Sequence, residues 1–168
     1  GINQEADGTV VQSFATGNVE TGDGGIKFRA GGLVGNNYGD ITESFATGNA
    51  EGGDGGEKFR DEVEVGGLVG SNNGDITASY ATGDAKVGDE GAVKAGGLVG
   101  NNADDEALID ESYAVGEVTG NSDGDLGGLI GINDGLLGTG DVTNSYWDVD
   151  ATGQTESDGS DNAFGLNT

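Results

Sequence analysis

Residues 31–48 read GGLVGNNYGDITESFATG, and residues 66–83 repeat this stretch as GGLVGSNNGDITASYATG. Eroded copies cover residues 96–116 and 127–147, and the second half of the unit also occurs at residues 8–17. One serine of the unit recurs at spacings of 31, 35, 33 and 33 residues, at Ser13, Ser44, Ser79, Ser112 and Ser145. A period in this range predicts a solenoid, in which units that cannot bury a core alone do so by stacking.

The unit is predicted to consist of short β-strands and turns. Gly accounts for 37 of the 168 residues, and each Gly inside a helix costs about 1 kcal/mol relative to Ala. Short apolar runs such as Leu33-Val34 are bounded by Gly pairs and Gly-Asn turns, as expected of strands. A second strand is expected over residues 41–46, and a third, more variable strand over residues 28–30. We therefore expect an all-β protein, a β-solenoid (β-helix) of about four to five stacked coils.

Alternation along the second strand assigns its side chains to two faces. Ser44 and Ala46 share one parity, Phe45 has the other, and the other copies repeat this pattern. Because successive side chains of a strand point to opposite faces, we expect Ser and Ala to face the core and the aromatic residues to face outward. The alternative places the aromatic residues inside. Ile41 could also reach the core if the chain bends between it and Ser44.

The Asn-rich segments that follow the apolar runs are expected to form turns. Asn suits left-handed backbone positions, and equivalent Asn side chains of neighbouring coils should stack as ladders. The segments are Asn36-Asn37, Asn72-Asn73 and Asn101-Asn102.

The composition excludes several classes of site. The chain has no Cys and no His, which rules out a disulfide framework, thiolate metal sites and a His general base. The formal net charge is −25, from 31 acidic and 6 basic residues, so the surface should repel nucleic acids and anionic membranes. We interpret the charge as a solvated acidic surface suited to high salt, with many bound divalent cations as the competing interpretation. No run approaches the roughly 20 apolar residues of a membrane span, so no membrane insertion is expected.

The recurring GGLVGNN, GDIT and S(F/Y)ATG segments resemble the GLUG-motif repeat family. The closing Ser145-Tyr146-Trp147-Asp148 and Thr152-Gly153-Gln154 are also similar to the usual end of such arrays. The resemblance implies an extracellular or cell-surface protein of the adhesin type, in which the repeats act as a stalk or a binding scaffold. It implies no catalytic residues. The acidity and the charged insertions of this chain depart from the family pattern.

The basic residues are confined to the variable segments between the motifs. They are Lys27, Arg29, Lys58, Arg60, Lys86 and Lys94. The triplets Lys27-Phe28-Arg29 and Lys58-Phe59-Arg60 are one coil apart, so we expect them to stack and to form an interface for an acidic partner surface. The alternative is a local ladder of ion pairs, which contributes little stability where it is exposed. The acidic partners in that ladder would be Glu57, Asp61, Glu62 and Glu64.

Two acidic segments have the spacing of a partial calcium loop. The matching residues are Asp148, Asp150 and Thr152 in one segment, and Asn121, Asp123 and Asp125 in the other. The first segment lacks the Glu expected at the twelfth position, where Gly159 stands. Oxygen-rich turns can bind Ca²⁺ without a full motif, so Ca²⁺ is the one cofactor that we consider.

Residues 1–147 are expected to form the solenoid, and residues 148–168 a terminal partial coil or cap. We expect a non-catalytic, extracellular or cell-surface module, either a stalk segment of an adhesin-like protein or a subunit of a filament. Filament growth by end-to-end stacking is suggested because the chain starts and ends in mid-unit. Its partners would be other copies or neighbouring repeats. A module that binds a surface glycan or Ca²⁺ is the alternative. Catalysis is disfavoured because no carboxylate pair is singled out.

Overall fold

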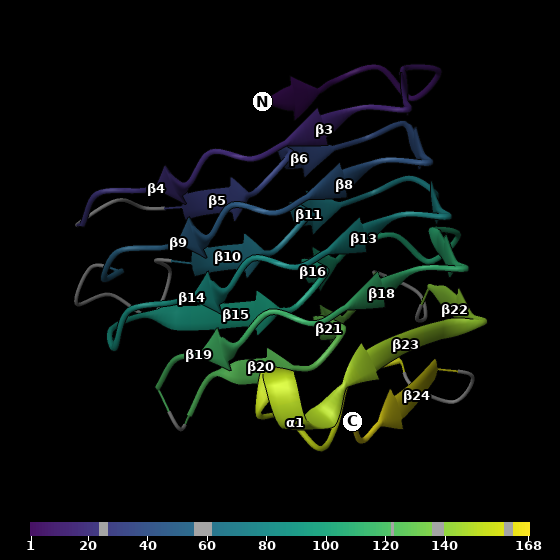
Figure 1. The fold of residues 1–168 in the computed structure, drawn as a ribbon. Helices are drawn as coiled ribbons and strands as arrows, with labels where there is room; N and C mark the ends of the chain where they lie inside the picture. The colour runs from purple at the N-terminus through teal and green to yellow at the C-terminus, as the bar shows by residue number, and fades with distance from the viewer. Residues whose placement is uncertain (24–26, 56–61, 122, 136–139, 160–162) are drawn as a thin grey trace.

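The computed structural model describes residues 1–168 apart from 24–26, 56–61, 122, 136–139 and 160–162. It is an all-β solenoid of about four turns, wound entirely from parallel strand pairs in its described part. Figure 1 shows the coils stacked in chain order from the N-terminal to the C-terminal end. A complete coil contributes one strand to each of five parallel sheets, which we name A to E.

Sheets A, B and C enclose the larger of two lobes. Sheet A contains β1 (Ile2–Asn3), β6 (Val34–Asn37), β11 (Val69–Asn72), β16 (Val99–Asn102) and β21 (Ile130–Asn133). Sheet B contains β2 (Thr9–Val11), β7 (Asp40–Thr42), β12 (Ile76–Thr77), β17 (Leu108–Asp110) and β22 (Asp141–Thr143). Sheet C contains β3 (Phe14–Ala15), β8 (Phe45–Ala46), β13 (Tyr80–Ala81), β18 (Tyr113–Ala114), β23 (Ser145–Asp148) and β24 (Ala163–Leu166).

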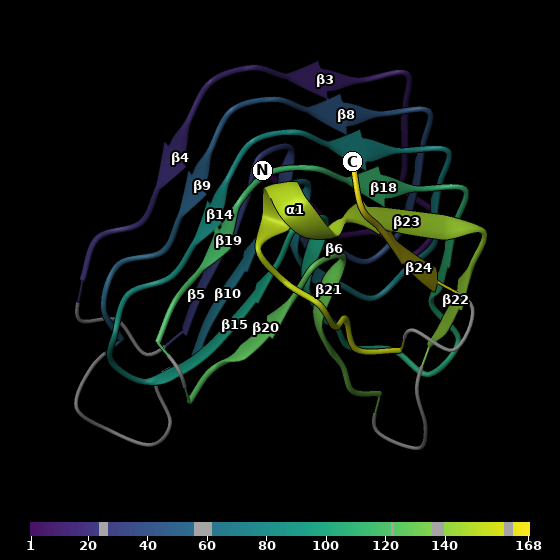
Figure 2. The same ribbon diagram turned by 60° about the horizontal axis from the view of Figure 1, so that its bottom comes forward.

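Sheets D and E form the smaller lobe, which lies beside the first in Figure 2. Sheet D contains β4 (Val19–Glu20), β9 (Ala50–Glu51), β14 (Ala85–Lys86) and β19 (Val118–Thr119). Sheet E contains β5 (Lys27–Gly31), β10 (Glu62–Gly66), β15 (Ala92–Gly96) and β20 (Asp125–Gly127). A one-turn helix, α1 (Val149–Thr152), follows β23. No helix among the described residues has the length and the apolar character that crossing a membrane requires.

The second strand of the predicted coil is in fact divided in two. Glu43 lies between β7 and β8 with φ of 49°, a left-handed conformation. The equivalent residues have φ between 47° and 50°, namely Gln12, Ala78, Glu111 and Asn144. Because of this bend, Ile41 and Ser44 both face the interior and both are fully buried. The inward orientation of Ser and Ala and the outward orientation of the aromatic residues are confirmed. The prediction of three strands per coil was wrong, because the bend splits one strand and sheet D adds another.

The third glycine of each GGLVG segment lets sheets A and E approach each other closely. A Cβ atom added to Gly70 would lie 2.9 Å from the backbone nitrogen of Ala30, and one added to Gly100 would lie 2.6 Å from that of Val65. These separations are too short for any side chain, so the two backbones meet only where Gly stands. The close approach separates the molecule into two hydrophobic cores, one for each lobe.

An asparagine ladder runs through the solenoid. Each Asn donates its side-chain N–H to the side-chain oxygen of the next Asn, with the amide nitrogen 2.8–2.9 Å from that oxygen. The members are Asn3, Asn37, Asn72, Asn102 and Asn133. The ladder was predicted, but its residues end the strands of sheet A and do not lie in left-handed turns. A second ladder links the backbone N–H of one repeat serine to the Oγ of the next, as from Ser44 to Ser79 at 3.1 Å.

Residues 148–159 and 163–168 lie over the last coil, at the bottom of Figure 1. Trp147 occupies the inward position that Ala114 holds in the preceding coil, and its Nε1 donates to the carbonyl of Gln154 at 2.9 Å. The Oγ of Ser157 accepts from the backbone N–H of Ile130 at 2.9 Å, and Oδ2 of Asp158 accepts from that of Asn133 at 2.8 Å. Two backbone donors of β21, those of Ile130 and Asn133, are therefore already bonded within the chain.

Candidate functional site

A cluster of charges lies where sheets A and E meet. Glu64 of β10 is directed away from the core of the smaller lobe, because its neighbours Val63 and Val65 belong to that core. Arg29 of β5 and Lys94 of β15 are its partners in register on either side. Glu64 is fully buried, and it is the only buried carboxylate in the described part of the chain.

The Glu64 carboxylate is bonded on both oxygens. Oε2 accepts from Nε of Arg29 at 2.7 Å, and Oε1 accepts from Nδ2 of Asn101 at 2.8 Å. Oε1 also lies 3.4 Å from Nζ of Lys27 and 3.8 Å from Nζ of Lys94. Three of the six basic residues of the chain therefore surround one carboxylate. Such a group is stable away from water only when it is paired and hydrogen-bonded.

These partners also set the charge state of Glu64. Burial by itself would raise the pKa of its carboxyl group, but the hydrogen bonds from Asn101 and Arg29 and the charges of Lys27 and Arg29 act in the opposite direction. The net result is a pKa below the ordinary value for Glu. Glu64 is therefore ionised at neutral pH, and its negative charge balances the positive charge of Arg29.

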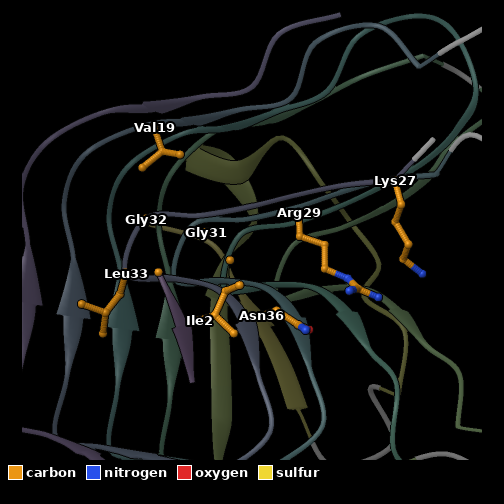
Figure 3. Close-up of a pocket in the computed structure, with 10 residues that line it drawn as sticks. Ile2, Val19, Lys27, Arg29, Gly31, Gly32, Leu33 and Asn36 are labelled. Atoms are coloured by element: carbon orange, nitrogen blue, oxygen red, sulfur yellow. The ribbon is translucent and has the colours of Figure 1, made fainter. Parts of the chain in front are cut away.

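A cavity of about 580 Å³ adjoins the cluster at the N-terminal end of the solenoid. Figure 3 shows Lys27 and Arg29 extending from β5 on the side where Asn36 lies, with Val19 and Leu33 placed apart from them. The Oδ1 atom of Asn36 is buried and has no hydrogen-bond partner. The same is true of Ser71 Oγ and Asn101 Oδ1, which are in register with Asn36 on the next two strands of sheet A.

The groups at this site are suited to binding a polar molecule. Asn36, Lys27 and Arg29 line the cavity, and amide, ammonium and guanidinium groups can hold water or a small polar ligand. The buried carboxylate is committed to Arg29 and Asn101, so it is not free to act as a general base. Among the described residues, no group of three or more acidic side chains is arranged to hold a metal ion.

The predicted stacking of the two basic triplets was wrong. Lys27, Phe28 and Arg29 pair with Glu62, Val63 and Glu64, which are 35 positions further along the chain. The triplet Lys58-Phe59-Arg60 includes only residues outside the described part of the chain. Lys27 and Lys58 are 31 residues apart, whereas β5 pairs with β10 at a spacing of 35 residues. The ion-pair alternative is correct for Lys27 with Glu62 and for Arg29 with Glu64, and an interface role for the triplets stays a prediction.

Several of the residues proposed for Ca²⁺ have other bonding partners in this structure. Oδ1 of Asp148 caps α1 by accepting from the backbone N–H groups of Asp150 and Ala151. Thr152 is buried and donates from Oγ1 to the carbonyl of Asp148 at 2.7 Å. In the second segment, Asn121 Oδ1 accepts from the backbone N–H of Asp123 at 3.0 Å, and Asp125 begins β20. Calcium binding stays a prediction.

The sequence did not predict that Glu64, Lys94 and Asn101 lie close together. A usable signal was present, because the Ser44 to Ser79 spacing of 35 residues places Glu64 opposite Arg29. The contact with Asn101 has no such signal, since it depends on how sheet A packs against sheet E.

The segments that match a known protein family coincide with the structural repeat. The family model described as the GLUG motif matches residues 28–51 and 62–87. Two of this chain's repeats are thus GLUG repeats. Each match spans one coil, from a strand of sheet E through sheets A, B and C to a strand of sheet D. The resemblance predicted from the sequence is therefore confirmed, and the GLUG unit corresponds to one turn of the solenoid.

Two further proteins resemble this chain. One, from Evansella cellulosilytica, is provisionally described as a Gly-rich membrane protein and is 40% identical over 61 residues. The match covers 36% of this chain and 7% of that relative, so the chain spans a small part of its length. The other is a crystal structure from Bacteroides ovatus, provisionally described as an immunoglobulin A1 protease. It matches 86% of this chain and 42% of its own chain, with a TM-score of 0.63 and 21% identity. That likeness shows the fold alone.

Proposed function

We propose that these GLUG repeats form a non-catalytic structural module of an extracellular or cell-surface protein, in which they act as a rigid stalk segment. The observation that carries this proposal is the continuity of the ladders from coil to coil. The Asn ladder connects Asn3 to Asn133 without a missing step. The recurring residues of the unit thus hold one coil against the next. A rod that bears load requires such contacts between all of its neighbouring coils.

The comparisons support this placement. The Evansella cellulosilytica relative is described as a membrane protein, and the match occupies 7% of its length. A repeat segment of that kind is suited to spacing other parts of a large surface protein from one another. The protease description belongs to the Bacteroides ovatus protein and is not transferred to this chain at 21% identity.

The bonding of the last coil supports a stalk over a filament. Filament growth by strand pairing requires free edges at both ends of the solenoid. At the C-terminal end, the backbone N–H groups of Ile130 and Asn133 are bonded to Ser157 and Asp158. A second copy would have to displace these contacts before it could pair with β21.

We also propose that the acidic surface is an adaptation to high salt. At about 1 M salt the Debye length falls to about 3 Å, which screens repulsion among the carboxylates. The denaturation midpoint of the isolated chain should therefore rise between about 0.1 M and about 3 M KCl. If a few millimolar Ca²⁺ or Mg²⁺ at constant ionic strength gave the same increase, cation binding would replace salt adaptation as the explanation.

The stalk role is tested by force spectroscopy of the chain held between two marker domains. Each 33-residue coil should lengthen the chain by about 110 Å when it unfolds, and the unfolding events should follow one another along the rod. Antibody against this chain should also label intact cells that make the parent protein. Labelling only after permeabilisation would overturn the surface location, and concentration-dependent polymers in light scattering would favour the filament over the stalk.

A further inference from the structure

The outer face of sheet C carries a stack of aromatic rings that stops part-way along the solenoid. The ring centroids of Phe14, Phe45, Tyr80 and Tyr113 follow one another at 5.4, 4.9 and 4.9 Å, with interplanar angles of 2° to 11°. Tyr146 is the register partner of Tyr113, yet these two described residues make no ring contact. Tyr146 instead lies against Phe164 at 6.1 Å with a tilt of 31°. The ring face of Tyr113 that points away from Tyr80 is therefore not covered by a ring.

The stack ends where the core changes. Beneath the rings, Ala46, Ala81 and Ala114 face inward in successive coils, and Trp147 takes the next position. Trp147 is anchored by its bond to the carbonyl of Gln154, and the chain then turns into α1. In the last coil, the residues that support the outer face of sheet C therefore differ from those of the preceding coils.

A cavity of about 270 Å³ opens at this break. It is lined by Tyr113, Val115, Tyr146, Trp147, Leu166 and Thr168, among others. Its wall is almost entirely carbon. Tyr113 and Tyr146 are each 40% exposed and Leu166 is 52% exposed, so the cavity can be reached from solvent.

The lining restricts the class of ligand. Sugars, carboxylates and primary amines lose hydrogen bonds to water in an apolar cavity and find few replacements there. A quaternary ammonium has no N–H group to satisfy, and its positive charge is attracted to the faces of aromatic rings. Asp148 is also among the residues that line the cavity. Hydrogen bonds from Ala151, Thr168 and Asp150 hold the pKa of Asp148 below its ordinary value, so this residue contributes a negative charge beside the cavity.

We propose that the cavity between Tyr113 and Tyr146 binds a trimethylammonium group. The ring faces of the two tyrosines supply the attraction, and the carbon wall formed with Val115, Trp147 and Leu166 excludes groups that need hydrogen bonds. The net charge of −25 favours a cation over a neutral apolar group of the same shape. This site is independent of the ladders that support the stalk role, so each proposal can fail without the other.

The test is a titration with choline chloride, followed by NMR of the labelled chain. The signals of Tyr113 and Tyr146 should shift and saturate, with a dissociation constant in the millimolar range. The matched probe is the neutral carbon isostere of choline, in which a tert-butyl group replaces the trimethylammonium group. It should bind at least about fivefold more weakly, as expected if the charge contributes a cation–π attraction. Equal binding of the two probes, or no saturable shift with choline, would overturn the proposal.

Variants locate the site. Tyr113→Leu should weaken choline binding about fivefold or more, while Tyr113→Phe, which keeps the ring, should retain it. Phe14→Leu removes an exposed ring at the far end of the same stack and should leave binding unchanged. If Tyr113→Leu does not fold, Tyr146→Leu carries the same expectation. Unchanged binding in a folded variant of either tyrosine contradicts the assignment.

Vesicles distinguish the two sources of the group. If the ligand is a lipid headgroup, the chain should co-sediment with phosphatidylcholine vesicles and choline should release it. If the ligand is a free solute, choline should bind while the vesicles leave the chain in solution. Vesicle binding that choline does not reduce would count against this cavity as the site.

Discussion

Nε of Arg29 lies 2.7 Å from Oε2 of Glu64, a carboxylate on the next coil with no exposed surface. The two residues belong to neighbouring strands of sheet E, and Lys94 follows them on the third strand. The ion pair therefore connects coils in the same way as the Asn and Ser ladders. It differs from them because a buried charge is much more costly to leave unpaired than a neutral amide.

Substituting Glu64→Gln should destabilise the fold strongly. The substitution preserves the shape of the side chain but leaves Arg29, Lys27 and Lys94 near one another without their shared counter-charge. We expect the free energy of unfolding to fall by about 3 to 5 kcal/mol, measured by urea denaturation. Glu51→Gln is the matched control, because it removes the same charge from an exposed pair with Lys86 and should cost less than about 1 kcal/mol. Equal losses in the two variants would show that burial of Glu64 is not important.

The contribution of Glu64 should disappear in acid. Its pKa in the folded chain lies below the ordinary value of 4.5, to which it returns on unfolding. A depressed folded pKa gives stabilisation that is complete above the unfolded pKa and is lost as the pH falls through the folded pKa. The difference in unfolding free energy between the wild type and Glu64→Gln should therefore be constant near neutrality and shrink below about pH 4.5. Comparing the two chains cancels the general effect of neutralising the other carboxylates, and a difference that stays undiminished as the pH falls below about 4.5 would contradict the prediction.

Asn72→Ala should weaken the middle of the Asn ladder. Asn72 accepts from Asn37 and donates to Asn102, in both cases at 2.8 Å, and also donates to the carbonyl of Gly74 at 2.6 Å. Its removal leaves buried groups without partners, at about 1–3 kcal/mol each. We expect a loss of about 2 to 4 kcal/mol in chemical denaturation. The neighbouring Asn73→Ala, at a half-buried position, should stay within about 0.5 kcal/mol of the wild type.

Ala78→Gly should stabilise the chain. Ala78 has φ of 50°, a conformation that costs L-residues about 1–2 kcal/mol and Gly almost nothing. The greater entropy of Gly in the unfolded chain offsets part of this gain, so we expect a net increase of about 0.5 kcal/mol. Ala92→Gly makes the same change in the extended strand β15 and should lower stability by about 0.5 to 1 kcal/mol. Thermal unfolding of both variants checks the prediction, and a loss of stability in each would show that the bend does not strain Ala78.

The two candidate sites differ in how far the sequence could indicate them. The basic residues of the charge cluster were identified as a group, and ion pairing with Glu62 and Glu64 was one of the two expected arrangements. The burial of Glu64 was not expected, because it depends on Asn101 and on the packing of sheet A against sheet E. The cavity at Tyr113 was not expected either, since the sequence continues the aromatic series at Tyr146 while the rings do not stack there.

The sequence by itself determined the solenoid, its period, and the parity that turns Ser44 and Ala46 inward and Phe45 outward. These are local properties of a strand, and equivalent residues of successive coils then stack automatically. Only the tertiary structure decided that Asn101 bonds to Glu64, that sheets A and E meet at glycine, and that residues 156–158 bond to the last coil. The loops between the repeated segments can take up inserted residues without changing the motif. The register is therefore fixed by hydrogen bonding and packing between coils, which the spacing within one repeat does not specify.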